Sequence, residues 1–454
     1  MSRPNATRRS LCAPAARPGP GLRALIAAGL ALWGSAGASG AATIHVDGVV
    51  CSLVDAVVAA NTDGPAGGCP QGDPGADLVV LDADVTLLAA HPGSTVYQGV
   101  AAGLPDVTDD LTIAAGAAAV IRRDPTFTCD ASTADPVFRF LNLEAGSLRL
   151  EGLTFEGGCF VAPESGSQGG GIRAGASTEI TLDRVTVRDF GAFSTVGSFQ
   201  GGFLLARGDR VAILDLEVDG VRVDVSSSLQ GGVLYLDTDG EAVVLDGSTF
   251  RNLSVFSSSS VQGGVLYGQS DLRVDGTTVE NLALAAGRSL QGGAFYVSAS
   301  DATHVLGSSF RLATLFIGGD SSIQGGVLYV RGSSGTALRL ADSTFTDIDS
   351  VAAGACDGGA IYASLDTVAE RLAVERCSCG SVTARADGGA ARFTERLTLR
   401  DSVFRGNEAL ASGSLARGGA VSASDIALAE RSAFVDNRAA AAASMGGLDA
   451  EGGG

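Results

Sequence analysis

The sequence predicts an all-β fold, a right-handed parallel β-helix that forms a single-stranded solenoid with a short helix over its N-terminal end. Three observations predict it. A Gln-Gly-Gly unit recurs every 29 to 33 residues, a column of bulky apolar residues recurs in phase with it, and helical periodicity is nearly absent between Asp77 and Phe434. A fixed period of about 20 to 50 residues indicates a stacked repeat architecture. The alternating and β-branched runs, punctuated by Gly, Asp, Ser and Asn, are typical of strands and turns.

The first column combines a polar residue with two glycines, mostly in the form Ser-apolar-Gln-Gly-Gly. Its polar positions are Gln168, Gln200, Gln230, Gln262, Gln291 and Gln324, continued by Asp357, Asp387 and Arg417, and its second glycines include Gly264, Gly293, Gly359, Gly389 and Gly419. The glycines are expected where the backbone turns sharply or takes a positive φ, which residues with a Cβ resist. Stacked Gln amides can donate to and accept from their neighbours. We therefore expect a structural ladder, with glycan contacts by the same row as the alternative.

The second column lies about 17 to 21 residues after the first and ends a Ser-, Thr- and Asp-rich strand. Its members are Phe155, Val187, Val218, Phe250, Val279, Phe310, Phe345, Val374, Phe404 and Phe434. Stacking at about 4.8 Å per rung would place these residues above one another inside the coil. A continuous core that no single rung could bury is the expected result.

The chain is expected to divide into four segments. Residues 1–41 have the features of a signal peptide: five Arg, an apolar stretch too short to span a membrane, and small residues. Residues 42–90 are expected to form an N-terminal cap, residues 91–437 the β-helix, and residues 438–454 a flexible Ala/Gly-rich tail. A secreted or surface-displayed protein is therefore expected, and a chain truncated before an anchor or barrel remains an alternative.

Charge and cysteine usage narrow the range of partners and the cellular compartment expected for this protein. Loss of the five Arg leaves 26 of the 31 basic residues against 50 acidic ones, a net charge of −24, and the chain contains no Lys. Nucleic acid and anionic membranes are poor partners for such a chain.

Spacing predicts the disulfides Cys51–Cys69 and Cys129–Cys159, which suits an oxidising compartment. Cys356 can pair with Cys377 or Cys379, and with three His in the chain no metal site is expected.

The N-terminal cap is expected to contain a short amphipathic helix. Ser52 and Asp55 have the spacing of a capping box, although Glu or Gln is usual at the second position. Leu53, Ala56, Val57 and Ala60 then fall on one helical face. Such a helix would cover the open end of the coil and prevent end-to-end association.

Two known families resemble parts of this chain. The hexapeptide Cys51-Ser52-Leu53-Val54-Asp55-Ala56, with Asn61 and Pro74-Gly75-Ala76-Asp77, resembles the CSLREA domain of exported bacterial β-helix proteins, although Val54 and Asp55 replace the Arg and Glu of that family. The C-terminal rungs are similar to polymorphic outer-membrane protein repeats, in GGAI-like elements (358–361, 418–421) and FxxN elements (404–407, 434–437). Both resemblances imply a secreted or surface-displayed β-helix, and neither supplies catalytic residues.

Three functions are compatible with these features. The first is a non-catalytic β-helix that acts in adhesion or glycan binding, with a polysaccharide or a host or cell-surface molecule as partner and no cofactor. The second is a polysaccharide lyase or glycoside hydrolase of the pectate-lyase-like β-helix class, for which Asp357 and Asp387 are weak catalytic candidates, because fold alone establishes no activity and Arg417 on the next rung could neutralise them. The third is a structural spacer of a larger surface protein.

Overall fold

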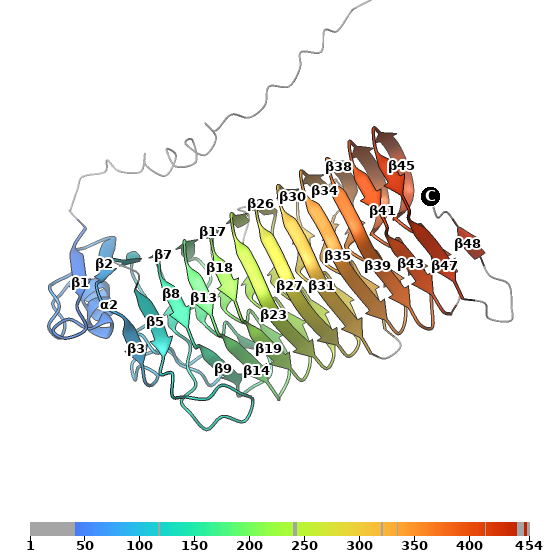
Figure 1. Cartoon of the computed structure of the whole chain (residues 1–454). Helices are drawn as coiled ribbons and strands as arrows, with labels where there is room; N and C mark the ends of the chain where they lie inside the picture. The colour runs from blue at the N-terminus through green and yellow to red at the C-terminus, as the bar shows by residue number, and fades with distance from the viewer. Residues whose placement is uncertain are drawn as a thin grey trace, which may run out of the picture.

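The structure is a computed structural model that describes residues 41–116, 119–238, 243–318, 321–333, 335–413, 415–442 and 449–451. It confirms the predicted all-β parallel β-helix, a solenoid of about 13 turns. Figure 1 shows the rungs stacked in one row, from the helix α2 at the N-terminal end to β45 and β47 at the other. Every strand pairing between successive rungs is parallel, and the described strands form three sheets of 21, 10 and 17 strands.

The 21-stranded sheet contains β1 (Thr43–Val46), β2 (Asp77–Leu81), β4 (Leu111–Ala115), β6 (Leu141–Leu143), β7 (Ser147–Glu151), β11 (Ile172–Ala174), β12 (Glu179–Asp183), β16 (Leu204–Ala206), β17 (Arg210–Leu214), β21 (Leu234–Leu236), β22 (Val243–Asp246), β25 (Leu266–Gly268), β26 (Leu272–Asp275), β29 (Phe295–Ala299), β30 (Ala302–Leu306), β33 (Leu328–Gly332), β34 (Ala337–Ala341), β37 (Ile361–Ser364), β38 (Asp366–Glu370), β41 (Ala391–Arg400) and β45 (Val421–Glu430).

The ten-stranded sheet contains β10 (Ser167–Gln168), β15 (Phe199–Gln200), β20 (Leu229–Gln230), β24 (Ser260–Gln262), β28 (Ser289–Gln291), β32 (Ile323–Gln324), β36 (Cys356–Asp357), β40 (Ala386–Asp387), β44 (Leu415–Arg417) and β48 (Asp449–Glu451).

The 17-stranded sheet contains β3 (Val85–Leu87), β5 (Val120–Arg123), β8 (Thr154–Glu156), β9 (Cys159–Ala162), β13 (Thr186–Arg188), β14 (Gly191–Ser194), β18 (Glu217–Asp219), β19 (Arg222–Val225), β23 (Thr249–Ser257), β27 (Thr278–Ala286), β31 (Ser309–Ile317), β35 (Thr344–Ala352), β39 (Ala373–Ser381), β42 (Val403–Arg405), β43 (Glu408–Ala411), β46 (Ala433–Val435) and β47 (Arg438–Ala441).

Both predicted columns are in register. The Gln positions pair rung by rung from Gln168 through Asp357, Asp387 and Arg417. The Phe/Val positions pair in the same way from Phe155 to Phe434. Phe250, Phe310, Phe345 and Phe404 are fully buried, whereas Phe434 on the last described rung is 38% exposed. The column therefore forms the continuous core that the repeat predicts.

The glycine pair has two separate roles, which corrects the expectation of a shared positive φ. The first glycine takes the left-handed conformation, as Gly263 does at φ +65°, and the second does not. A Cβ on Gly264 would lie 2.4 Å from the carbonyl oxygen of Gly293 on the next rung. Gly293, Gly359 and Gly389 meet the next rung in the same way. The second glycine is thus required by close stacking rather than by its own φ.

The N-terminal helix α2 (Leu53–Thr62) is present where the sequence predicts it. The Ser52 side chain accepts a hydrogen bond from the Asp55 backbone N–H and donates one to the Asp55 carboxylate. The capping box is therefore only half formed, because Asp55 bonds the hydroxyl instead of a free backbone N–H. Leu53, Ala56 and Val57 are buried against the first rungs, and Figure 1 shows α2 at the end of the stack beside β1 and β2.

The expected segment boundaries differ from the structure at both ends of the coil. In the 42–90 segment, β1, β2 and β3 pair into the same sheets as later rungs, so this cap is continuous with the solenoid. In the 438–454 segment, β47 pairs with β43 and β48 pairs with β44, so the described part of the expected flexible tail continues the coil. Residues 1–40 of the expected signal peptide lie outside the described residues.

Three disulfides tie neighbouring parts of the coil together. Cys51–Cys69 and Cys129–Cys159 are confirmed, and Cys356 pairs with Cys379 rather than with Cys377. Cys377 is a buried free thiol, and burial raises its pKa to about 12, which leaves it protonated and unreactive at neutral pH. Among the described residues, no helix is long and apolar enough to cross a membrane.

Candidate functional site

The outward face of the ten-stranded sheet carries two parallel rows of uncharged polar side chains. Successive residues of a strand point to opposite faces. In β24, Val261 is therefore buried in the core while Ser260 and Gln262 both face outward. The same alternation repeats in β28, where Ser289 and Gln291 lie directly above them. We name these the Gln row and the Ser row; the Gln row is Gln168, Gln200, Gln230, Gln262, Gln291 and Gln324, and the Ser row is Ser198, Ser228, Ser260 and Ser289.

The Gln row forms the predicted hydrogen-bonded ladder. The Gln200 amide donates to the Gln230 side-chain oxygen at 2.6 Å, and Gln230 donates to Gln262 at 2.9 Å. The next two bonds, to Gln291 and Gln324, are both 2.8 Å long. The Ser row is bonded in part, because the Ser289 hydroxyl donates to Ser260 at 2.8 Å.

The ladder leaves hydrogen-bonding capacity unused. A Gln side chain has two N–H donors and an oxygen with two lone pairs. On the central rungs, Gln230, Gln262 and Gln291 each spend one donor on one neighbour and one lone pair on the other. One donor and one acceptor therefore remain on each of these three rungs, and both are repeated about every 4.8 Å along the axis. The Gln side chains are half-buried, so these groups can meet solvent or a ligand.

A groove of about 630 Å³ runs over both rows. Its lining extends from Gln168 to Gln291 and includes every member of the Ser row. These positions span four rung intervals, or about 19 Å. Among the residues that the structure describes, no charged side chain lines it, although the whole chain has a formal net charge of −19. The groove is thus an elongated, neutral, polar channel parallel to the solenoid axis.

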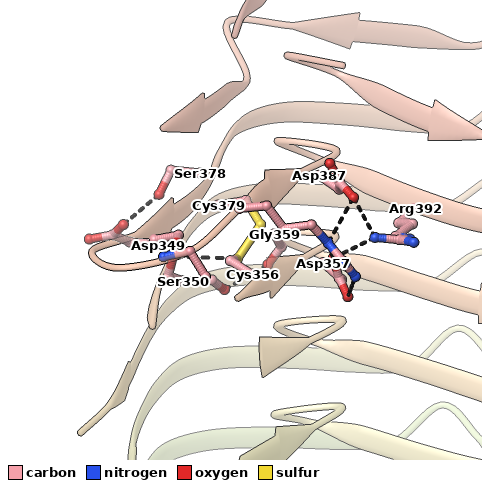
Figure 2. Close-up of a disulfide and its surroundings, with 12 residues drawn as sticks. Asp349, Ser350, Cys356, Asp357, Gly359, Ser378, Cys379, Asp387 and Arg392 are labelled. Carbon is pink, nitrogen blue, oxygen red and sulfur yellow. Dashed lines mark hydrogen bonds and ion pairs between the residues drawn. A yellow bond between two sulfur atoms is a disulfide. The ribbon is translucent and has the colours of Figure 1, made fainter. Parts of the chain in front are cut away.

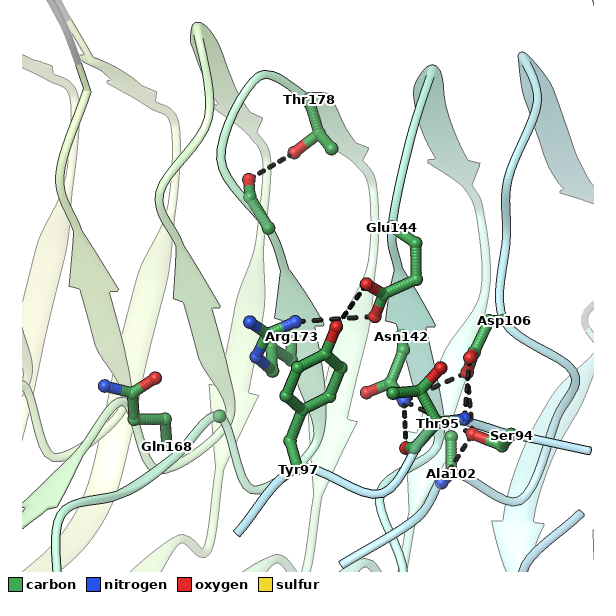
Figure 3. Close-up of polar contacts among 12 residues, drawn as sticks. Ser94, Thr95, Tyr97, Ala102, Asp106, Asn142, Glu144, Gln168, Arg173 and Thr178 are labelled. Carbon is green, nitrogen blue, oxygen red and sulfur yellow. Dashed lines mark hydrogen bonds and ion pairs between the residues drawn. The ribbon is translucent and has the colours of Figure 1, made fainter.

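A loop between β3 and β4 closes the N-terminal end of the groove. Gln98 lies at the tip of this loop, lines the groove and donates to the Gly166 carbonyl oxygen at 2.8 Å. Figure 3 shows what holds the loop: Tyr97 bonds to Glu144 while Arg173 lies over the Tyr97 ring, 3.4 Å from its centroid. Burial and the Glu144 hydrogen bond raise the pKa of Tyr97, so its phenol remains a donor.

A second polar cluster fixes the other side of the same loop. The Asp106 carboxylate accepts from the Ser94 hydroxyl, from the Thr95 backbone N–H and from the Asn142 amide, at 2.6 to 3.0 Å (Figure 3). Although burial opposes it, these hydrogen bonds hold the pKa of Asp106 below its usual range. The fully buried Arg139 donates to carbonyl oxygens of the loop and of residues 168 and 169. This wall of the groove is therefore rigidly anchored to the first rungs.

An aromatic ladder lies on the strands that follow the glycine pairs. Tyr235, Tyr267, Tyr296, Tyr329 and Tyr362 stack with ring centroids 4.8 to 5.1 Å apart and nearly parallel planes. The first four are at most 7% exposed, because each ring covers the next. Arg207 lies over the Tyr235 ring and donates to the Gln200 side-chain oxygen at 3.0 Å. The aromatic ladder thus supports the groove but offers it no ring face.

Asp357 and Asp387, the weak catalytic candidates, lie on adjacent rungs where the Gln row ends. Figure 2 shows them bridged by Arg392, whose Nη1 is 2.5 Å from Asp357 Oδ1 and 2.6 Å from Asp387 Oδ2. Arg385 contacts both carboxylates at 3.1 Å. The two carboxylates are only 3% and 4% exposed. A glycosidase pair must reach both sides of a sugar bond, so this arrangement suits an ion-pair network between rungs.

Sequence reasoning located the Gln row but missed its surroundings. The Ser row could have been found, because a residue two positions before Gln in a strand shares its face. The Arg385 and Arg392 contacts had no local sequence signal, since Arg385 is an isolated Arg just before β40 and Arg392 is an isolated Arg within β41. The closing loop was also missed, because its anchors are 36 to 76 residues away from it in the sequence.

The geometry defines a class of protein: a disulfide-containing parallel β-helix with a neutral polar groove along one face. Among the described residues, no group of His, Cys, Asp and Glu side chains is arranged to hold a metal ion. No family model, curated protein or solved structure matches this chain. The resemblances of the cap and of the C-terminal rungs to known families therefore rest on their residues alone.

Proposed function

We propose that this protein is a non-catalytic β-helix that binds a neutral polysaccharide in the groove over the Gln and Ser rows. The single observation that carries the proposal is the unused donor and acceptor on each central rung of the groove, at Gln230, Gln262 and Gln291. A sugar hydroxyl both donates and accepts, so a polyhydroxyl chain complements such a row at every rung. A charged ligand would gain no ion pair there and would lose its hydration.

The proposal includes export and action at a cell or matrix surface, as in an adhesin. Disulfides persist mainly in oxidising compartments, and three of them support this placement. The signal-peptide features of residues 1–41 and the CSLREA-like cap also support export. The ion-pair contacts of Asp357 and Asp387 give no support to a lyase or hydrolase.

The test compares binding of neutral oligosaccharides of increasing length by titration calorimetry. Affinity should rise with length until the groove of about 19 Å is filled. The double variant Gln230→Ala/Gln262→Ala should weaken binding by about tenfold or more, because it removes two free donors and two free acceptors from the centre of the groove. Thermal unfolding of the variant checks that the rungs remain folded.

The matched control is Gln269→Ala, because Gln269 bonds the Tyr267 hydroxyl outside the groove. Its affinity should equal that of the unmodified protein. Equal affinity of the groove variant would refute the proposal. Release of new reducing or unsaturated ends that stops in Asp357→Asn or Asp387→Asn would replace it with the enzyme alternative.

A further inference from the structure

The 17-stranded sheet exposes two Phe side chains on its outward face, away from the Gln and Ser rows. Phe256 at the end of β23 is 47% exposed, and Phe316 at the end of β31 is 54% exposed. Strand register aligns them in one column, with Ala285 of β27 between them. The two rings are therefore two rungs, or about 9.6 Å, apart.

This spacing distinguishes the pair from the other aromatics of the molecule. Where aromatics occupy consecutive rungs, as in the Tyr ladder, they stack at about 5 Å and bury one another. At Phe256 and Phe316 the small Ala285 leaves the space between the rings unfilled, so each ring remains a separate exposed platform. Exposed aromatic surface is costly in water and commonly marks a binding site.

The positions beside and between the two rings on their own three rungs are uncharged. They are Ser254 in β23, Ala283 and Ala285 in β27, and Thr314 in β31. Charged side chains begin at the borders of this patch: Asp224 lies on the rung before Phe256, and Asp349 lies on the rung after Thr314. A neutral partner that covers only the patch therefore displaces no ionic hydration from the positions between the rings.

We propose that Phe256 and Phe316 form a stacking platform for an extended β-1,4-linked polysaccharide lying parallel to the solenoid axis. In such a chain successive sugars are flipped, so alternate rings present the same face at an interval close to two rungs. The C–H groups of a sugar face pack on an aromatic ring, which supplies apolar contact without charge. The inference rests on the proposed function for its ligand class, but its site is a different face of the molecule.

The test measures retention of the purified protein by insoluble cellulose and chitin, both β-1,4-linked. Insoluble β-1,3-glucan and starch granules are the linkage controls and should retain it less. Phe256→Ala/Phe316→Ala should lower the partition onto cellulose or chitin by about tenfold. Both side chains are half exposed, so the variant should keep the unfolding temperature of the parent protein.

Three comparisons separate ring stacking from other causes of retention on the insoluble polymer. Phe256→Trp/Phe316→Trp should retain binding, whereas Phe256→Leu/Phe316→Leu should lose it, because Leu is apolar but not planar. Val382→Ala removes an equally exposed apolar side chain after β39 and should leave the partition onto cellulose or chitin unchanged. Full retention by the Leu or the Ala double variant would overturn the platform.

The two proposals fail in different assays. Suppose that the groove variant binds soluble oligosaccharides more weakly while the Phe variants keep their partition onto insoluble polymer. The groove proposal is then supported and the platform proposal is refuted. Suppose instead that the Phe variants no longer partition onto the polymer while the groove variant binds soluble oligosaccharides as the parent protein does. The platform proposal is then supported and the groove proposal is refuted. No retention by any β-1,4-linked polymer refutes the platform regardless of the groove result.

Discussion

At the scale of single residues, the Gly-Gly pair shows how stacking selects a sequence. Gly263 takes a left-handed φ at the corner, and a Cβ on it would lie 1.9 Å from the Leu266 carbonyl oxygen of its own rung. Gly264 has an ordinary φ, but a Cβ there would collide with the backbone of the rung above. One glycine satisfies the turn and the other satisfies the 4.8 Å spacing of the coil.

Replacement of Gly264 by Val should therefore destabilise the protein by about 1–3 kcal/mol, the usual cost of forcing extra atoms into a packed site. Thermal or denaturant unfolding measures the change. Gly318→Val is the matched control, because a Cβ on Gly318 has no atom within 4 Å and its φ is not positive. Similar unfolding of both variants would count against the close stacking described for the second glycine.

At the scale of elements, the Tyr ladder converts five surface positions into a buried stack. Leu234 and Leu236 of β21 point into the core and Tyr235 points outward, yet Tyr235 is only 3% exposed. Its neighbours on adjacent rungs provide the cover. Burial removes water from the phenols and disfavours their charged form, which raises the pKa of each ladder tyrosine.

These shifts predict instability at alkaline pH. All six tyrosines of the chain, Tyr97 included, have pKa values raised above about 10, the ordinary value of an unfolded tyrosine. Below pH 10 the phenols are neutral in both states and the ladder's contribution is complete. Above pH 10 the unfolded state ionises first, so the free energy of unfolding falls as pH rises.

Phenolate absorbance should therefore remain low in the native protein past pH 10, and then rise together with the loss of β-sheet circular dichroism. The denaturant-unfolded protein is the control and should titrate near 10. Six phenols that titrate near 10 with the fold intact would contradict the buried ladder.

Prediction from sequence worked best for the elements that repeat. Both columns, the helix near Leu53 and two disulfides follow from spacing, because each rung imposes the same geometry on its neighbours. Non-repeating contacts had no such redundancy: the Arg392 bridge and the loop at Gln98 depend on pairings that only the folded coil brings together. Leu312 shows the same limit of prediction. It takes φ +55° at a corner that Asn252 and Asn281 occupy on earlier rungs, and unlike Asn a leucine does not indicate a left-handed conformation in the sequence.

At the scale of the whole molecule, the stack depends on how its ends are covered. Each rung is paired only with the rungs before and after it, so the first rung would expose its core to water if nothing covered it. Ile44 and Val46 of that rung are fully buried, and α2 packs there with Leu53 and Val57 also buried. The helix thus replaces the missing rung on the N-terminal side.

Leu53→Asp should release α2 from the coil, because a carboxylate cannot be buried there without a partner. The apolar end of the first rung would then be exposed, and exposed strand ends of this kind promote association. Sedimentation velocity should show concentration-dependent dimers or larger species in the variant and a single species in the parent protein. Thr62→Asp adds the same charge at an exposed position of the same helix and should leave the sedimentation profile unchanged. A Leu53→Asp variant that sediments as the parent does, with its unfolding temperature unaltered, would show that the coil does not need α2 to close its end.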